Sequence, residues 1–204
     1  MEDIILVGFG GHAKSIADSI EQSKEYRIIG YTEQTVCNGA SGYNYLGTDD
    51  VLEEYYSKGV KCAMICVGYL GKSRIRDRLY TQLKSIGYKL PVIIDNSAII
   101  AKDARIEEGS YIGKGAIVNA NAKLDKMCII NSGAIVEHEC KIGEFVHVAV
   151  GAVLCGNVSV RAHSFVGANA TIIQGISIGE NCVIGAGSTV LKNVVTDKTV
   201  YGVY

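Results

Sequence analysis

The sequence lacks an excess of either charge, since 20 Lys and Arg residues stand against 21 Asp and Glu, and no basic run occurs. This balance argues against nucleic acid or an anionic membrane as the principal partner. Long apolar runs are also missing, because no stretch reaches the roughly 18 residues of a membrane-spanning helix. The first residues, Met1-Glu2-Asp3, lack the basic start of a signal peptide. We therefore expect a cytoplasmic protein.

The sequence also lacks closely spaced cysteine pairs and has little proline. The seven cysteines include no CxxC pair, so we expect buried free thiols in a reducing compartment rather than disulfides or a metal site. Pro91 is the only proline and marks the entry to an expected strand at 92–94. With 48% hydrophobic and 20% charged residues, the chain can bury a core and is not disordered.

An internal repeat dominates the second half of the chain. From Ile100 to Val190 every sixth residue is Ile, Val or Leu, which makes 16 consecutive repeats. The residue four places after each of these aliphatic anchors is small or Cβ-branched, with Ile176 as the exception in size. A period of six fits neither an amphipathic helix nor an alternating strand. It predicts a β-solenoid of triangular cross-section in which three hexapeptides make one coil.

The two columns define the expected interior of this prism. The anchors point inward and the small residues, which include Cys128, Cys140 and Cys182, fill the space beside them. Gly or Asn often follows the anchor, as at Asn119 and Gly143. We expect these types there because they accept the tight backbone of a corner.

Residues 1–95 predict a small parallel α/β sheet instead of a repeat. We place the boundary near Asn96, without a flexible linker, so that domain 1–95 is α/β and domain 96–204 is the prism. The expected strands are 4–7, 27–31, 63–67 and 92–94, and the expected helices are 13–23, one opening at 49, and 72–86.

The turn after the first expected strand is a candidate phosphate site. Gly8-x-Gly10-x-x-Ala13 matches the relaxed dinucleotide fingerprint, and Glu33 lies about 20 residues further on, at the end of the second strand. Backbone N–H groups at a helix N-terminus bind phosphate in general. The small sheet and the lack of a hydride-transfer domain favour a nucleotide-sugar diphosphate over NAD, and a structural turn is the remaining alternative.

A second glycine turn runs from Gly68 to Arg74, after the third expected strand. The switch-point rule places it at the same edge of the sheet as the first turn. Lys72 or Arg74 could then contact a phosphate, and a solvated charge is the equal alternative.

Three of the four histidines fall in the repeat, at His138, His147 and His163. None occupies an interior column, so we expect all three at or near the outer surface. Their spacing does not suit a three-histidine zinc site, and no metal is expected. Neither Cys140 nor Cys155 has an evident low-pKa environment that would make it an acylated nucleophile.

His138 stands between two carboxylates in Glu137-His138-Glu139. A carboxylate beside an imidazole favours its charged form, raises its basicity and can fix its tautomer. This is the arrangement of a general base that removes a proton from an amine or a hydroxyl. The alternative is a solvated polar strip on one face of the prism.

The stretch from Val136 to Ala152, VEHECKIGEFVHVAVGA, resembles the active-site region of the hexapeptide-repeat bacterial sugar acetyltransferases. This family includes the UDP-4-amino-sugar N-acetyltransferases and the sialic acid O-acetyltransferase-like proteins. The resemblance covers the whole chain and implies a Rossmann-like small α/β domain followed by an all-β left-handed parallel β-helix. It also implies a homotrimer whose active sites lie between two prisms.

The resemblance assigns roles to individual residues. His138 matches the catalytic base, and Glu139 matches the carboxylate that raises its basicity. The residues implied to contact the co-substrate acetyl-CoA are His147, Ala168 and Ala186. The Gly10-Gly11-His12 turn matches the loop that holds the nucleotide-sugar phosphates, and the substrate-binding residues we expect are Gly10, Gly11, His12, Glu33 and Gly68.

The leading hypothesis is acetyl transfer from acetyl-CoA, without a metal, to the amino group of a nucleotide-linked sugar. A UDP-4-amino-4,6-dideoxy sugar of bacterial glycan biosynthesis is the expected acceptor. O-acetylation of a sialic acid or related sugar is the second hypothesis. A non-catalytic trimeric scaffold that binds nucleotide sugars is the third, and a nucleotide-dependent oxidoreductase is the fourth.

Overall fold

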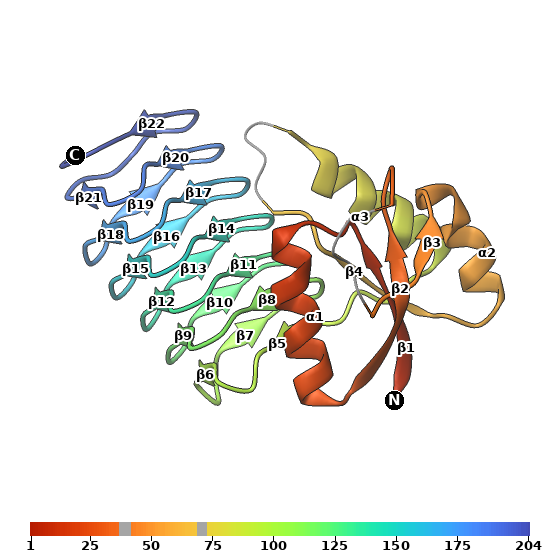
Figure 1. Ribbon diagram of the computed structural model, residues 1–204. Helices are drawn as coiled ribbons and strands as arrows, with labels where there is room; N and C mark the ends of the chain where they lie inside the picture. The colour runs from red at the N-terminus through yellow and green to blue at the C-terminus, as the bar shows by residue number, and fades with distance from the viewer. Residues whose placement is uncertain (37–41, 69–72) are drawn as a thin grey trace. The chain divides into compact units, whose positions relative to one another are not determined.

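The computed structural model describes residues 1–36, 42–68 and 73–204. It contains two compact units, Met1–Ile93 and Ile94–Tyr204. The first is a small α/β domain, and the second is a stack of short parallel strands (Figure 1). The predicted fold class, an α/β domain followed by a left-handed parallel β-helix, is confirmed.

The α/β domain is built on a parallel sheet with the strand order β3-β2-β1-β4. The central strand β1 is an apolar run whose Ile4, Ile5 and Leu6 are fully buried, as expected for a strand covered on both faces. Its strands are β1 (Glu2–Val7), β2 (Tyr26–Thr32), β3 (Tyr45–Gly47) and β4 (Cys62–Ile65), and its helices are α1 (Gly11–Ser23), η1 (Asp49–Val51), α2 (Leu52–Ser57) and α3 (Ile75–Ile86).

The prediction for the last strand of this sheet was wrong. The segment predicted at 92–94 forms β5 (Ile93–Ile94), which belongs to a sheet of the prism. The fourth strand of the α/β sheet is instead β3, which pairs with β2. It was missed because three half-buried residues are too few to show a hydrophobic period.

Three parallel sheets form the sides of the prism, and we name each after one of its strands. The β14 sheet contains β5, β8 (Tyr111–Ile112), β11 (Ile129–Ile130), β14 (His147–Val148), β17 (Phe165–Val166), β20 (Val183–Ile184) and β22 (Thr199–Val200). The β12 sheet contains β6 (Ile99–Ile100), β9 (Ile117–Val118), β12 (Ile135–Val136), β15 (Val153–Leu154), β18 (Thr171–Ile172) and β21 (Thr189–Val190). The β13 sheet contains β7 (Arg105–Ile106), β10 (Lys123–Leu124), β13 (Lys141–Ile142), β16 (Ser159–Val160) and β19 (Ser177–Ile178).

Successive coils stack in register, so that a residue pairs with the one 18 positions later, as Lys123 does with Lys141. The predicted interior columns are confirmed. The anchors Val136 and Leu154 and the small residues Ala134 and Cys140 are all fully buried. Burial raises the pKa of the Cys140 thiol to about 11, so this thiol is neutral and packs as a small apolar group.

The corners correct our explanation of the glycines. The left-handed backbone lies three places after the anchor, as at Asn121 (φ 57°) and Gly133 (φ 67°), not directly after it. Gly143, which does follow an anchor, is required for a different reason. A Cβ there would lie 2.7 Å from the backbone nitrogen of Ala162 in the next coil, so glycine permits the close approach of two backbones.

The regular coil ends with the sixteenth repeat. Beyond Val190 the chain takes a shorter path, since Val200 pairs with Ile184 only 16 positions earlier. Val194 forms an isolated bridge with Ile178 and takes the inward place of an anchor, 3% exposed. The last coil therefore closes the prism with the same kind of residue but without the hexapeptide spacing.

Gly143→Ala should destabilise the prism by about 1–3 kcal/mol, because the added methyl group overpacks against the backbone of the next coil. Chemical denaturation followed by far-UV circular dichroism measures this change. Lys141→Ala, at an exposed position two residues earlier, is the control and should stay within about 0.5 kcal/mol of the unmodified chain. Equal stability of the two variants would contradict the close-approach explanation.

Candidate active site

His138 lies in the corner that joins β12 to β13, within the turn 137–140. Its Nδ1 atom is 3.4 Å from Oε2 of Glu139, and the two side chains are 51% and 63% exposed. Glu139 has a left-handed backbone, with φ 62°, at a place that most other corners give to Gly or Asn, whereas Met127, Phe145 and His163 share its conformation. The structure therefore brings together the predicted base and its predicted carboxylate at an accessible edge of the prism.

The second flanking carboxylate has a different task. Oε2 of Glu137 accepts hydrogen bonds from Nδ2 of Asn119 at 3.0 Å and from the backbone N–H of His138 at 3.1 Å. Glu137 thus ties the turn to the preceding coil, whereas Glu139 faces the imidazole ring. The sequence pattern alone did not separate these two roles.

Gly156 lies one coil beyond His138 and directly against its ring. A Cβ at Gly156 would be 2.5 Å from both Cε1 and Nε2 of His138. The backbone N–H of Asn157 donates a hydrogen bond to the carbonyl oxygen of His138 at 2.8 Å, which holds the two turns in register. We predicted no role for Gly156 from the sequence, although a single glycine at this turn position was visible there.

His147 lies outside the two interior columns, as predicted, but it is buried rather than accessible. It belongs to β14, is only 8% exposed, and packs edge-on against Phe165 with the ring centroids 5.3 Å apart. Its Nε2 atom is 3.4 Å from Nδ2 of Asn131. His163 is partly buried and stacks on Phe145, with the ring centroids 5.2 Å apart.

Ala168 and Ala186 lie together, but at a different corner from His138. Both occupy turns that lead from the β14 sheet to the β12 sheet, one coil apart. The backbone N–H of Gly187 donates to the carbonyl oxygen of Ala168 at 2.8 Å. Within one prism the predicted base and the predicted CoA-contacting residues therefore occupy separate corners, at the two ends of the strands of the β12 sheet.

In the α/β domain the first glycine turn and Glu33 meet at the carboxyl edge of the sheet. Oε2 of Glu33 accepts a hydrogen bond from the backbone N–H of Phe9 at 3.1 Å. Gly10 is the N-cap of α1 and provides no side-chain cap. Among the described residues, no atom beyond the chain neighbours and the helix backbone lies within 4 Å of a Cβ built on Gly10 or Gly11.

His12 is largely buried beside this turn. Burial, and then the positive charge of Arg76, lower its pKa to about 4. His12 is therefore a neutral imidazole at pH 7, able to hydrogen-bond a ligand but not to form a charged pair with a phosphate.

Gly68 follows β4 at the same edge, because β4 is the parallel neighbour of β1. Residues 69–72 of the second glycine turn, with Lys72, lie outside the described residues, as does Cys37. Arg74 is 3.5 Å from Asp77 in an ion pair within α3 and its N-cap. The strand order β3-β2-β1-β4 makes the space between β1 and β4 the topological switch point, where ligands of open α/β sheets bind.

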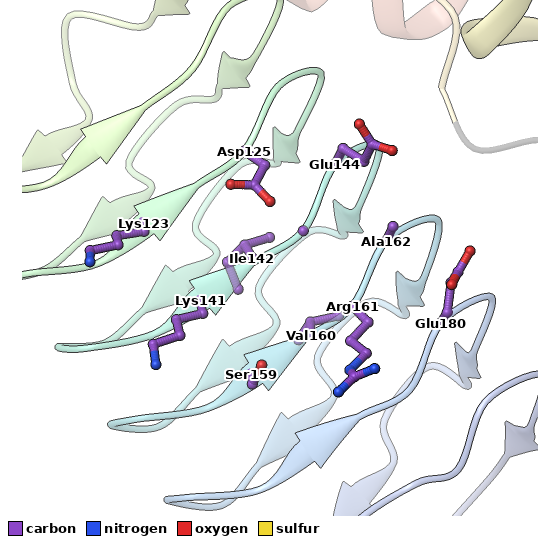
Figure 2. A pocket seen from close by; sticks show the side chains of 11 residues that line it. Lys123, Asp125, Lys141, Ile142, Glu144, Ser159, Val160, Arg161, Ala162 and Glu180 are labelled. Carbon is purple, nitrogen blue, oxygen red and sulfur yellow. The ribbon is translucent and has the colours of Figure 1, made fainter.

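A groove of about 550 Å³ crosses the outer face of the β13 sheet. Figure 2 shows the cations Lys123, Lys141 and Arg161 along one side and the carboxylates Asp125, Glu144 and Glu180 along the other. Glu144 is also paired with Lys126 at 2.8 Å. The opposite charges balance, and no residue predicted for the active site lines this groove.

The β12 sheet carries an apolar outer row that the sequence analysis did not single out. Ile99, Ile117, Ile135 and Val153 stand at the outward place of successive strands, and Ile99 is 64% exposed. The signal was present in the sequence as an aliphatic residue before each of the anchors 100, 118, 136 and 154, whereas threonine precedes the last two anchors of this sheet. A row of this kind on a sheet face favours burial against another protein surface.

Neither a metal-binding cluster nor a membrane-spanning helix is found in the part of the chain that the structure describes. Among residues 1–36, 42–68 and 73–204, no cluster of three His, Cys, Asp or Glu side chains is arranged to hold a metal ion. No described helix is long and apolar enough to cross a membrane.

Comparisons with known protein families agree with this architecture. Residues 3–83 match the PglD N-terminal domain, and residues 157–192 match the hexapeptide repeat of succinyl-transferase. These two matched regions lie in the α/β domain and in the prism. The resemblance to this family and the assignment to the acyltransferases are thereby confirmed. Among curated proteins no match was found.

Solved structures of two bacterial enzymes cover nearly the whole chain. The acetyltransferase domain of PglB from Neisseria gonorrhoeae is 29% identical, with a TM-score of 0.92 over 99% of this chain and 97% of that one. The same domain in complex with acetyl coenzyme A is 28% identical, with a TM-score of 0.90 over 98% and 96%. PerB from Caulobacter crescentus, in complex with CoA and GDP-perosamine, is 27% identical, with a TM-score of 0.91 over 99% and 95%.

The stability of the α/β domain should fall as the pH drops from about 6.5 to about 4, because the unfolded chain binds a proton at His12 that the folded domain excludes. The loss should approach about 3 kcal/mol at the acid end and should be absent in His12→Gln. Urea unfolding followed by tyrosine near-UV circular dichroism measures it. The control His163→Gln should keep the pH dependence, and an unchanged profile in His12→Gln would refute the assignment.

Proposed function

We propose that this protein transfers the acetyl group of acetyl-CoA to the amino group of a nucleotide-linked sugar, with His138 as general base. The observation that carries the proposal is the accessible Glu139–His138 pair at the corner of the prism, 3.4 Å apart. The solved structures with acetyl coenzyme A and with CoA and GDP-perosamine support the choice of both substrates.

The geometry of the pair supports a separate task for each ring nitrogen of His138. Nδ1 faces Glu139, so the carboxylate favours the tautomer with the proton on Nδ1 and leaves the lone pair on Nε2. Nε2 takes a proton from the sugar amine while the amine nitrogen attacks the thioester carbonyl. A carbon–nitrogen bond forms, the carbon–sulfur bond breaks, and the imidazolium returns the proton to the departing CoA thiolate.

A homotrimer completes this site in the proposal. His138 and the Ala168–Ala186 edge lie at separate corners of one prism, so His138 of one subunit would face acetyl-CoA held along the alanine edge of a neighbour. The β12 sheet lies between these two corners. Its apolar outer row of Ile99, Ile117, Ile135 and Val153 supports this sheet as the subunit interface. His147 would then contact the CoA from the adjoining β14 sheet.

The α/β domain would hold the nucleotide-sugar phosphates at the N-terminus of α1. The N–H groups of Gly10 and Gly11 can donate to phosphate oxygens without charge. The neutral His12 and the second turn at Gly68 flank the same edge. Glu33 accepts a hydrogen bond from Phe9 in this turn and would accept another from a ribose hydroxyl.

The nucleotide and the acceptor position are the finer parts of the proposal. We propose a UDP-linked 4-amino sugar, and the GDP-linked perosamine bound by PerB is the directly competing choice. An acceptor hydroxyl, as in sialic acid O-acetylation, is the third outcome that a substrate panel distinguishes.

His138→Ala should lower turnover by about 10²–10⁴-fold, since general-base help of this size is lost, without dissociating the assembly. The measurement is CoA thiol release from acetyl-CoA with UDP-4-amino sugars, GDP-perosamine and sialic acids as acceptors. Lys123→Ala, on the outer face of the β13 sheet, is the control and should keep full turnover. Full activity of His138→Ala with the preferred acceptor would remove this residue from the mechanism.

Ile135→Glu should convert the trimer to monomers, because a carboxylate in the middle of the apolar row would be buried without a partner. Size-exclusion chromatography with light scattering gives the mass in solution. Lys141→Glu places the same charge on the β13 sheet and should leave the mass unchanged. Acetyl transfer should be lost together with the trimer, and a fully active monomer would refute the inter-subunit site.

A further inference from the structure

One position in the prism departs from its equivalents. The residue two places after the anchor forms the outer point of every corner, and in fifteen of the 16 repeats it carries a side chain. The exception is Gly156. The residues at this place are Lys102, Glu108, Lys114, Ala120, Lys126, Ser132, His138, Glu144, Val150, Gly156, Ala162, Ala168, Gln174, Glu180, Ala186 and Lys192.

The backbone at Gly156 does not require glycine. Its φ is not in the left-handed region, which in this corner is occupied by Asn157 at φ 55°. The equivalent positions before and after it carry His138 and Gln174. Glycine costs conformational entropy wherever another residue would fit, so its presence at this one corner needs a local reason.

The reason on the structure is the imidazole of His138. A Cβ on Gly156 would lie 2.5 Å from Cε1 and from Nε2, far inside van der Waals contact. The ring is the outer end of a half-exposed side chain, so an added methyl group would turn the ring aside rather than displace the backbone. The displaced atoms would include Nε2, which carries the lone pair of the proposed base.

We infer that Gly156 is a positioning residue: because it has no side chain, it leaves the space in which the His138 ring lies. Glu139 limits the ring at Nδ1, and the backbone of Gly156 limits it at Nε2. This inference deepens the proposed function and rests on it for its effect on rate. The position of the ring itself does not depend on which substrate is acetylated.

Gly156→Ala should leave the melting temperature within about 2 °C of the unmodified protein, because the backbone accepts alanine and only a side chain moves. It should lower kcat about 10²-fold, the cost of a displacement of about 1 Å at a reacting group. The KM for acetyl-CoA should change little. In the imidazole ¹H–¹⁵N spectrum the His138 signals should shift while those of His163 stay.

Two further variants separate the outcomes. Ala162→Gly makes the reverse exchange at the next corner and should keep full turnover. In a His138→Ala background, Gly156→Ala should cost no additional activity, because the two residues act through one ring. A further loss there, or unshifted His138 signals, would overturn the inference. If instead His138→Ala keeps full turnover, the proposed function fails while the spectral shift still tests the position of the ring.

Discussion

In-register stacking of parallel coils is the constraint on which the prism depends. Each coil is joined to the next through backbone hydrogen bonds, such as the one that Asp125 N–H donates to the carbonyl oxygen of Ile142 at 2.8 Å. A buried backbone group without such a partner would be costly, so the coil length stays constant. With the coil length constant, aliphatic residues meet aliphatic residues inside, and the side chains outside form straight rows along each face and corner.

The same stacking determines the chemistry at the corner. His138 has Ala120 one coil before it and Gly156 one coil after it, and these neighbours follow from the register alone. Most equivalent turns carry Gly or Asn in the left-handed conformation, whereas this turn carries Glu139. The left-handed conformation costs free energy for a residue with a larger side chain.

In the proposed function, the two domains recognise the substrates in different ways. In the α/β domain, backbone N–H groups of an uncapped helix and a neutral His12 present donors without net positive charge. In the prism, rigid corners present single side chains at intervals set by the coil. The phosphates of a nucleotide sugar would bind to the backbone donors of the α/β domain. Proton transfer instead needs an imidazole ring held in position, as that of His138 is at the corner of the prism.

The sequence by itself determined the repeat, the buried columns and the Glu-His-Glu corner, because a period of six over 16 repeats leaves one way to bury the anchors. It could not decide short-range pairings that lack a period, and so β3 was missed and β5 was placed in the wrong sheet. Only the tertiary structure decided that His147 is buried, that Glu137 faces Asn119, and that Gly156 touches the His138 ring. These contacts depend on rotamers and on stacking across 18 residues, which a linear pattern does not encode.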